Sequence, residues 1–179
     1  MRRLQIGVIG SCNDLNYSKA AAECGRRLGS LIAKSGSTLV FGAEKDINSL
    51  PTVAAQAAKA EGGETLAITY EKCLELFSNE AATTVVATGL VRGGGRELSL
   101  ILSCDVVIAL AGGSGTLNEI CVAYQANIPV ILLTGFGGWS DKLAGTYLDD
   151  RKRYKFIGAK TPQKALSLAL QICEKARNE

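Results

Sequence analysis

The sequence predicts an α/β protein with a Rossmann-like, doubly wound parallel sheet of about six or seven strands flanked by helices. Two observations predict this fold class. Short apolar runs rich in Val, Ile and Leu alternate with longer segments of helical periodicity, as expected where parallel strands are buried on both faces. Glycine-rich turns follow several of these runs, at the strand ends where such sheets bind their ligands.

Seven strands and five helices are predicted in alternation. The strands are expected at Leu4–Ile9, Ser37–Phe41, Glu64–Thr69, Thr83–Thr88, Asp105–Leu110, Pro129–Thr134 and, as a short last strand, Tyr154–Gly158. The helices are expected near 18–35, 50–62, 93–104, 116–127 and 162–177. The glycine-rich segment 135–139, which ends in Trp139, is interpreted as a mobile loop.

Length and composition indicate one globular domain over residues 1–179. Hydrophobic residues make up 47% and charged residues 21% of the chain, which is ordinary for a globular protein. The net charge of +3 is small and its Lys and Arg residues are dispersed, so a nucleic-acid partner is not expected. No apolar run is long enough to cross a bilayer, and we expect a cytoplasmic protein without a membrane partner.

The absence of histidine restricts the chemistry that the chain can perform. The commonest general base and the commonest metal ligand are both missing, so catalysis would depend on carboxylates, Arg, Lys, Tyr or backbone amides. We predict no metal site and no required cofactor. The six cysteines occur singly, without a C-x-x-C pair, and are interpreted as buried free thiols.

A glycine loop after the strand at Asp105–Leu110 is predicted to bind an anion. Glycine lets the backbone approach a ligand closely, and the amides and dipole at the start of the following helix attract phosphate. The predicted anion-binding residues are Gly112, Gly113, Ser114, Gly115 and Thr116. Glu119 follows Thr116 at the spacing of a capping box, and the spacing is equally compatible with a role in the site.

A second glycine-rich turn, at 89–95, opens the next predicted helix. Arg92 and Arg96 flank its three consecutive glycines. Such arginines can bind phosphate or carboxylate through two parallel hydrogen bonds. They are equally compatible with an exposed helix surface, and the sequence leaves both interpretations open.

The segment from Arg96 to Glu119 resembles the LOG (Lonely Guy) family, formerly described as lysine decarboxylase-like, which includes the molybdenum cofactor carrier proteins. The family hallmark P-G-G-x-G-T-x-x-E is matched from Gly112 to Glu119, with Ala111 in place of the proline. The resemblance covers nearly the whole chain, from the opening strand and loop at 6–11 to the last helix start at Thr161-Pro162.

This resemblance implies a nucleoside 5′-monophosphate phosphoribohydrolase, which splits the N-glycosidic bond into base and ribose 5-phosphate without a metal. Arg96 and Glu119 would be catalytic, with Glu119 stabilising the oxocarbenium-like ribose or positioning water. The family match places further ligand contacts at Gly10, Ser11 and Gly42. It also implies a homodimer or higher homo-oligomer. Lysine decarboxylation is not expected, because no lysine has the setting of a Schiff base.

Two departures from the family pattern favour an alternative, a noncatalytic carrier of a nucleotide or molybdopterin. The usual R-K-x-x-M is here Arg-Glu-Leu-Ser-Leu from Arg96, and the glycine-rich stretch after the second strand is replaced by the charged segment 41–51. An NAD-dependent oxidoreductase is disfavoured because Gly7 and Gly10 do not form a G-x-G-x-x-G turn. Trp139 is expected either to stack on a base or to pack against the protein.

Overall fold

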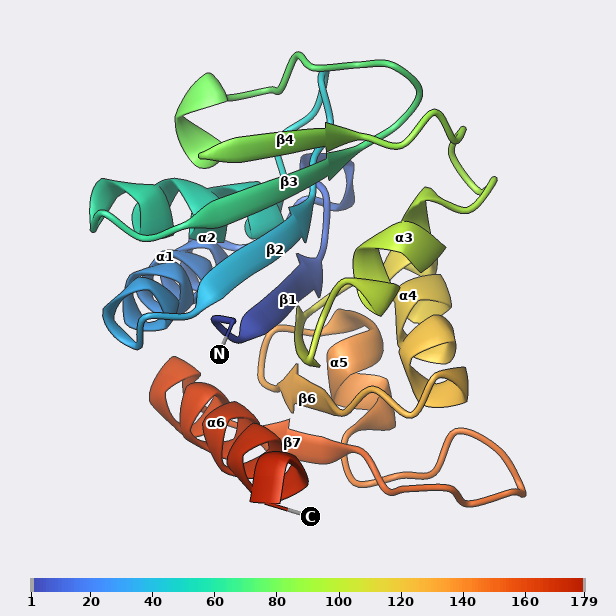
Figure 1. The fold of residues 1–179 in the computed structure, drawn as a ribbon. Helices are drawn as coiled ribbons and strands as arrows, with labels where there is room; N and C mark the ends of the chain where they lie inside the picture. Colours follow the sequence, from blue (N-terminus) through green and yellow to red (C-terminus); the bar gives the residue numbers. More distant parts are fainter. Residues whose placement is uncertain (1, 179) are drawn as a thin grey trace.

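The computed structural model describes residues 2–178 and confirms the predicted fold class. Seven strands form one sheet in the order β4-β3-β2-β1-β5-β6-β7 (Figure 1), and every neighbouring pair is parallel. The strands are β1 (Gln5–Gly10), β2 (Thr38–Gly42), β3 (Thr65–Thr69), β4 (Thr84–Ala87), β5 (Val106–Leu110), β6 (Val130–Leu133) and β7 (Ile157–Ala159). The order reverses between β1 and β5, so the chain leaves these strands in opposite directions and opens a crevice at their carboxyl ends.

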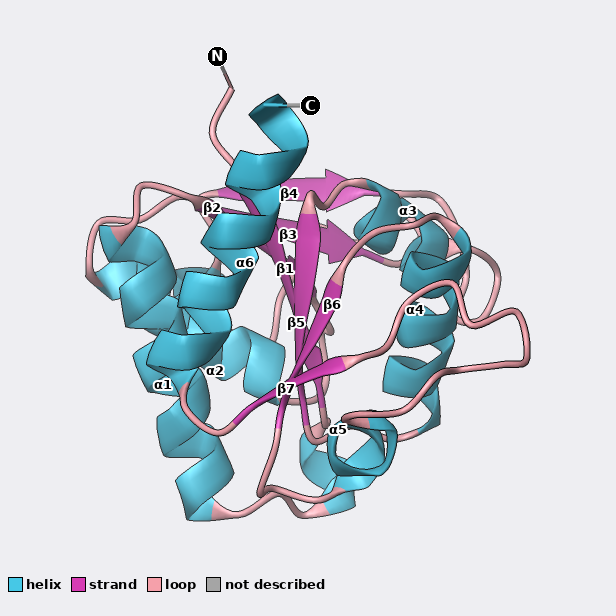
Figure 2. Ribbon diagram, turned by 90° about the horizontal axis from the view of Figure 1, so that it is seen from below, coloured by secondary structure: helices cyan, strands magenta, loops and turns pink. Residues whose placement is uncertain are grey.

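Helices cover both faces of the sheet (Figure 2). One face carries α1 (Lys19–Lys34), α2 (Leu50–Ala60) and α6 (Pro162–Asn178), and the other carries α3 (Arg96–Leu102), α4 (Ser114–Gln125) and α5 (Gly138–Leu143). Two short 3-10 turns, η1 (Asn13–Leu15) and η2 (Asn79–Ala81), complete the elements. No helix within residues 2–178 is long and apolar enough to span a membrane.

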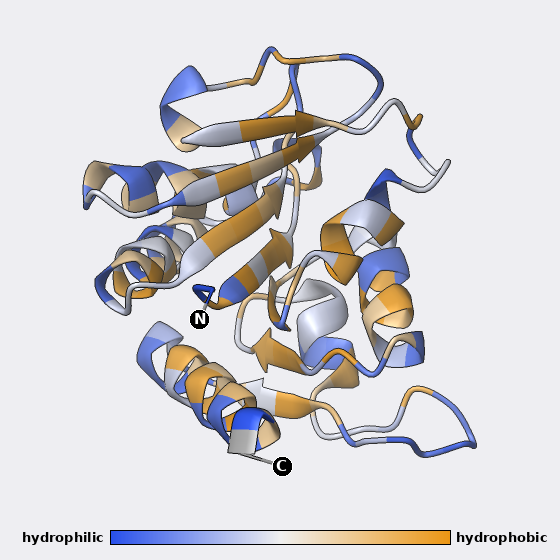
Figure 3. Cartoon of the chain, in the orientation of Figure 1, coloured by the Kyte–Doolittle hydropathy of each residue, from blue (hydrophilic) through white to orange (hydrophobic). Residues whose placement is uncertain are grey.

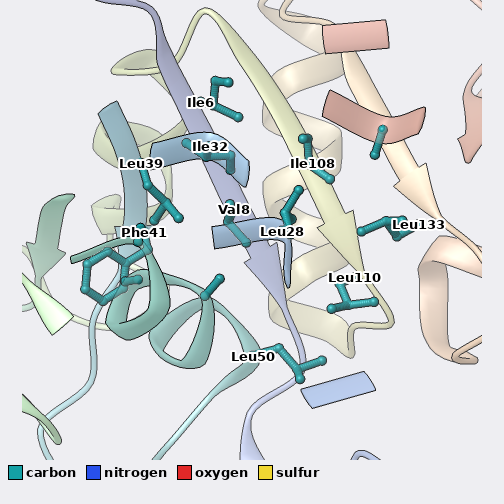
Figure 4. Packing of buried hydrophobic residues seen from close by; sticks show 14 of the residues in the cluster. Ile6, Val8, Leu28, Ile32, Leu39, Phe41, Leu50, Ile108, Leu110 and Leu133 are labelled. Atoms are coloured by element: carbon teal, nitrogen blue, oxygen red, sulfur yellow. The ribbon is translucent and has the colours of Figure 1, made fainter. Parts of the chain in front are cut away.

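The strands alternate their side chains between two hydrophobic clusters. On the α1 side, Ile6 and Val8 of β1 pack with Leu28 of α1 (Figure 4). On the opposite side, Ile9 of β1 packs in the cluster that contains Ile101 of α3. Figure 3 shows apolar residues along most of the strands, and polar and apolar residues alternating along the helices. Burial of each such side chain stabilises the fold by about 1.5–3 kcal/mol, so the central strands are a firm platform for the loops at their ends.

The helix predicted to begin near 93 starts only at Arg96. Gly93 and Gly95 have positive φ angles of 69° and 116°, which are left-handed conformations that a right-handed helix does not contain. The three glycines therefore form a turn before α3, and the helix is correspondingly short.

The last strand, predicted at Tyr154–Gly158, forms at Ile157–Ala159 instead. Tyr154 and Phe156 are drawn into a cluster of rings with Tyr124 of α4, with centroid separations of 5.1–6.0 Å. Ring packing therefore decides the conformation of this segment, and β7 pairs with β6 only after Phe156.

The glycine-rich segment interpreted as a mobile loop leads directly into α5. The Asp141 carboxylate accepts hydrogen bonds from the amides of Gly135 and Gly137, at 2.6 and 2.7 Å. The segment is therefore a hydrogen-bonded turn. The cysteines are all free, as predicted, although only Cys24, Cys104 and Cys173 are buried and the other three are partly exposed.

Candidate functional site

A cavity of about 200 Å³ opens at the carboxyl ends of β1, β2 and β5. We call it the charged cavity, because Arg92, Arg96, Glu44 and Glu119 all line it. It brings together most of the residues predicted from sequence, namely Gly10, Gly42, Arg96, Gly113, Ser114, Gly115, Thr116 and Glu119. The two remaining predicted residues, Ser11 and Gly112, line an adjoining cavity.

Helix α4 begins at Ser114, with Gly113 as its N-cap residue and no side-chain cap. The first amides of a helix have no acceptor within the helix, and Ser114 and Gly115 are exposed. The amides of Ser114 and Gly115 are therefore available to an anion, and Thr116, although buried, lines the same cavity. The positive end of the helix dipole attracts negative charge to this place.

The capping box compatible with the sequence does not form. Thr116 is the third residue of α4 and lies inside the helix, because the helix begins two residues earlier than the predicted 116. Glu119 consequently lies in the second turn, and within residues 2–178 it makes no hydrogen bond to a backbone amide. Its carboxyl group faces the charged cavity instead of capping the helix.

The turn between β5 and α4 is held in an unusual backbone conformation. Ala111 and Gly112 have φ angles of +55° and +101°, and their carbonyl oxygens accept hydrogen bonds from the amides of Ser140 and Trp139, both at 3.0 Å. The amide of Gly112 donates to Ser11 Oγ at 2.9 Å. Ser11 and Gly112 therefore hold the turn in place, and the Gly112 amide is not available to a ligand.

The backbone conformation at Ala111 is incompatible with the proline of the family hallmark. Proline is restricted to a φ near −65°, whereas Ala111 has a φ of +55°. A proline therefore cannot occupy this position with the present backbone. The loop of this chain must follow a path different from that of a loop that contains the hallmark proline.

Arg96 is buried, with 4% of its surface exposed. Its guanidinium lies over the ring of Tyr70, 3.9 Å from the centroid, and its Nη2 donates to Glu44 Oε1 at 3.0 Å and to the Tyr70 hydroxyl. A Cβ atom on Gly42 would lie 1.8 Å from Arg96 Nη1. Gly42 is thus required to admit the arginine, and Arg96 is held by the protein on three sides.

Glu44 joins two arginines. Its second oxygen accepts a hydrogen bond from Arg92 at 2.6 Å, and Arg92 itself is 68% exposed. Burial raises the pKa of Glu44, and the charges of Arg96 and Arg92 act in the opposite direction. The sequence prediction missed Glu44, although its charge in the segment directly after a buried strand was a usable signal.

Tyr70 extends this network to a second carboxylate. Its hydroxyl donates to Glu97 Oε1 at 2.6 Å, and burial raises its pKa to about 12, so the hydroxyl keeps its proton at neutral pH. Tyr70 directly follows β3, and its place at a strand end was the signal that could have identified it. The acidic neighbour of Arg96 that departs from the family pattern, Glu97, is thus used as a hydrogen-bond acceptor.

Glu119 and Arg96 line the same cavity but form no ion pair with each other within residues 2–178. Burial raises the pKa of Glu119 to about 8, and the charge of Arg96 only partly opposes that effect. The Glu119 carboxyl is therefore largely protonated at neutral pH. Such a group can donate a hydrogen bond to a ligand or exchange a proton with it.

Comparison with known protein families shows to which family the chain belongs. The SLOG cluster4 family matches residues 3–166 of the chain. The chain belongs to this family. The resemblance of its sequence to LOG proteins and to the molybdenum cofactor carrier branch is thereby confirmed.

The relatives of this SLOG cluster4 protein include a curated but uncharacterised protein of Archaeoglobus fulgidus, 34% identical over 127 residues, which are 70% of this chain and 76% of the relative. The molybdenum cofactor binding protein of the phototrophic bacterium Rippkaea orientalis has a similar structure, with 30% identity, a TM-score of 0.80, and 96% and 98% of the two chains covered. The molybdenum cofactor carrier protein of Chlamydomonas reinhardtii has 26% identity, a TM-score of 0.79 and the same coverage.

Substitutions of Ala111 test the conformation of the turn after β5. Ala111→Gly should raise the free energy of unfolding by up to about 1 kcal/mol, because glycine adopts positive φ without strain. Ala111→Pro should lower it by about 2 kcal/mol or more, because the turn and its hydrogen bonds must rearrange. Urea unfolding measures both changes, and a proline variant as stable as the wild type would contradict the described turn.

The pKa of Glu119 predicts a pH-dependent effect of Glu119→Gln. Below about pH 4 the carboxyl is protonated in both the folded and the unfolded chain. Between the ordinary pKa of 4.5 and the folded value of about 8, only the unfolded chain loses the proton, so the wild type loses stability as the pH rises. Glutamine removes this loss, and its advantage should grow from near zero at pH 4.5 to at least about 1 kcal/mol at pH 8.5.

Unfolding titrations at the two pH values measure this difference. Glu174→Gln, on the exposed surface of α6, is the matched control and should change stability by less than about 0.5 kcal/mol at either pH. An effect of Glu119→Gln that is the same at pH 4.5 and pH 8.5 would show that the Glu119 carboxyl titrates normally.

Proposed function

We propose that the protein binds a phosphorylated small molecule, with the phosphate at the N-terminus of α4, and that this ligand is a pterin phosphate of the molybdenum cofactor type. The observation that carries the proposal is the open first turn of α4, which faces a cavity that also contains Arg92 and Arg96. The similar structures from Rippkaea orientalis and Chlamydomonas reinhardtii, a molybdenum cofactor binding protein and a molybdenum cofactor carrier protein, support the same ligand class.

The charged groups of the cavity suit a bound phosphate. A phosphate monoester carries a charge of about −1.5 to −2 at neutral pH, and three helix amides offer it hydrogen bonds. Arg92 is mostly exposed, and its hydrogen-bonded side-chain partner is Glu44, so it can turn from Glu44 to the ligand. Arg96 also lines the cavity, and its side chain is buried and held by Glu44 and Tyr70, so its positive charge attracts the phosphate from a fixed position.

Binding without chemistry is consistent with how Arg96 is held. Its guanidinium contacts Glu44 and Tyr70, and these contacts fix it as part of the cavity wall. The residue that would act with it in catalysis, Glu119, is largely protonated at neutral pH. The site is therefore better suited to holding a phosphate ester than to stabilising a developing positive charge on a sugar.

Gly115 gives the sharpest test of phosphate binding. Apart from its chain neighbours and the nearby backbone of its own helix, no atom of the described residues lies within 4 Å of the position of a Cβ on Gly115, so a side chain fits there. Gly115→Asp should preserve or increase helix stability, because a carboxylate in the first turn interacts favourably with the helix dipole, but it should repel a phosphate. Gly115→Asn is the matched control, since it has the same shape without the charge.

The measurement is the cofactor that copurifies from a host able to make it. Bound pterin, oxidised to a fluorescent product, and molybdenum per chain are determined for the wild type and both variants. We expect Gly115→Asp to carry at least about tenfold less than wild type, and Gly115→Asn to remain within about threefold of it. The proposal is wrong if Gly115→Asp carries as much pterin and molybdenum per chain as the wild type, or if the wild type binds no phosphorylated ligand.

The second candidate function is the nucleoside-monophosphate phosphoribohydrolase that the family resemblance implies. The observation in its favour is the Glu119 carboxyl, which has no hydrogen-bond or ion-pair partner among residues 2–178 and lines the same cavity as the first turn of α4. With the 5′-phosphate at those amides, a protonated Glu119 would protonate the departing base, and water would attack C1′ of the ribose. The products would be free base and ribose 5-phosphate.

Incubation with AMP tests this candidate. If it is right, adenine and ribose 5-phosphate appear in equal amounts, and Glu119→Gln lowers the rate by about 100-fold or more. The rate should also fall above about pH 8, where Glu119 loses its proton. Asn118→Ala, at the exposed neighbouring position of α4, should leave the rate within about twofold. If no products form, or if Glu119→Gln has no effect, the hydrolase candidate is wrong.

A further inference from the structure

A second cavity, of about 440 Å³, adjoins the glycine turn after β5. We call it the aromatic cavity, because the aromatic residues Tyr17, Phe136 and Trp139 line it, together with Lys142. We propose that the aromatic cavity binds the flat heteroaromatic ring of the ligand whose phosphate occupies the N-terminus of α4. This inference rests on the proposed function and specifies which part of the ligand each cavity holds.

The two cavities meet at the phosphate-binding turn. Leu15 and Gly113 line both of them. Leu15 is 54% exposed, and its Cδ1 atom would lie 2.7 Å from a Cβ on Gly113, so the leucine side chain lies directly over the glycine. One exposed side chain and one glycine thus separate the cavities, and a ligand bound at the α4 amides can extend into either.

Trp139 is positioned by the same turn that presents the amides. Its amide donates to Gly112 O at 3.0 Å, and the amide of Ser140 donates to Ala111 O at 3.0 Å. A Cβ on Gly138 would lie 2.5 Å from the carbonyl carbon of Ala111, so the start of α5 lies against the turn. The tryptophan is therefore held at a defined position relative to a bound phosphate, which reduces the entropic cost of binding a two-part ligand.

The setting of Trp139 is that of a binding surface. Its side chain is partly exposed and belongs to neither hydrophobic cluster of the described residues. The Nζ atom of Lys142 lies 4.6 Å from the ring centroid, which adds a positive charge beside an anionic ligand. The partly exposed face of Trp139 offers a surface on which a flat heteroaromatic ring can stack, and a cavity of this size admits such a ring system.

The ligand class follows from the two cavities together. The amides of α4 select a ligand with a phosphate ester, and the aromatic cavity selects one with a flat heteroaromatic ring. Pterin phosphates and purine nucleotides share this chemistry. Neopterin 3′-phosphate represents the first group and has no glycosidic bond, AMP represents the second, and ribose 5-phosphate supplies the phosphate without a ring.

Trp139 is the only tryptophan in the chain, so tryptophan emission reports on this cavity alone. The three probes are titrated while emission and heat of binding are followed. We expect the ring-bearing probe that fits, neopterin 3′-phosphate or AMP, to quench emission and to bind at least about tenfold more tightly than ribose 5-phosphate. Trp139→Leu should abolish the tighter binding of the ring-bearing probe while changing the affinity for ribose 5-phosphate by less than about twofold. Trp139→Phe should restore part of the tighter binding.

The outcomes separate this inference from the proposed function. If ribose 5-phosphate binds but neither ring-bearing probe binds more tightly or quenches emission, the aromatic cavity is not a ring site and the phosphate site stands. If Trp139→Leu still binds the ring-bearing probe more tightly than ribose 5-phosphate by the same factor, the ring binds elsewhere and the inference is wrong. If no probe binds, the proposed function fails and this inference fails with it.

Discussion

The site depends on two main-chain hydrogen bonds, from the amides of Trp139 and Ser140 to the carbonyl oxygens of Gly112 and Ala111. They hold both turn residues at positive φ, a conformation that costs about 1–2 kcal/mol for a non-glycine residue such as Ala111. That conformation carries the chain sharply from β5 into α4 and leaves the first amides of the helix unobstructed. The fold places this turn at the reversal of strand order between β1 and β5, where side chains from several strands meet.

A second constraint comes from burying a charge beside that turn. A buried guanidinium without compensation is costly, and the protein compensates Arg96 with the carboxylate of Glu44 and the ring and hydroxyl of Tyr70. The close contact between Gly42 and Arg96 explains why a glycine remains at the end of β2 although the following residues are charged. The charged segment that departs from the family pattern is thus part of the same network as the arginine that follows the pattern.

The sequence was sufficient for the features that depend on local patterns. Continuous apolar runs located β1 and β5 within a residue of their observed bounds, and glycine content located the turn before α4. The sequence was insufficient where the same residue spacing is compatible with two structures. Thr116 and Glu119 have the spacing of a capping box, but α4 begins earlier, at Ser114, and the box does not form. The sequence prediction also missed Glu44 and Tyr70, which lie 52 and 26 residues from Arg96, because only the pairing of β2 and β3 within the sheet brings them to the arginine.

The proposed phosphate site is the first turn of α4. The most direct measurement is a titration of isotopically labelled protein with ribose 5-phosphate, followed by NMR of the backbone amides. We expect the amide resonances of Ser114, Gly115 and Thr116 to shift most, and the resonance of the Gly112 amide, which already donates to Ser11 Oγ, to shift less. Saturable shifts centred on other amides, with these three unchanged, would contradict the proposal.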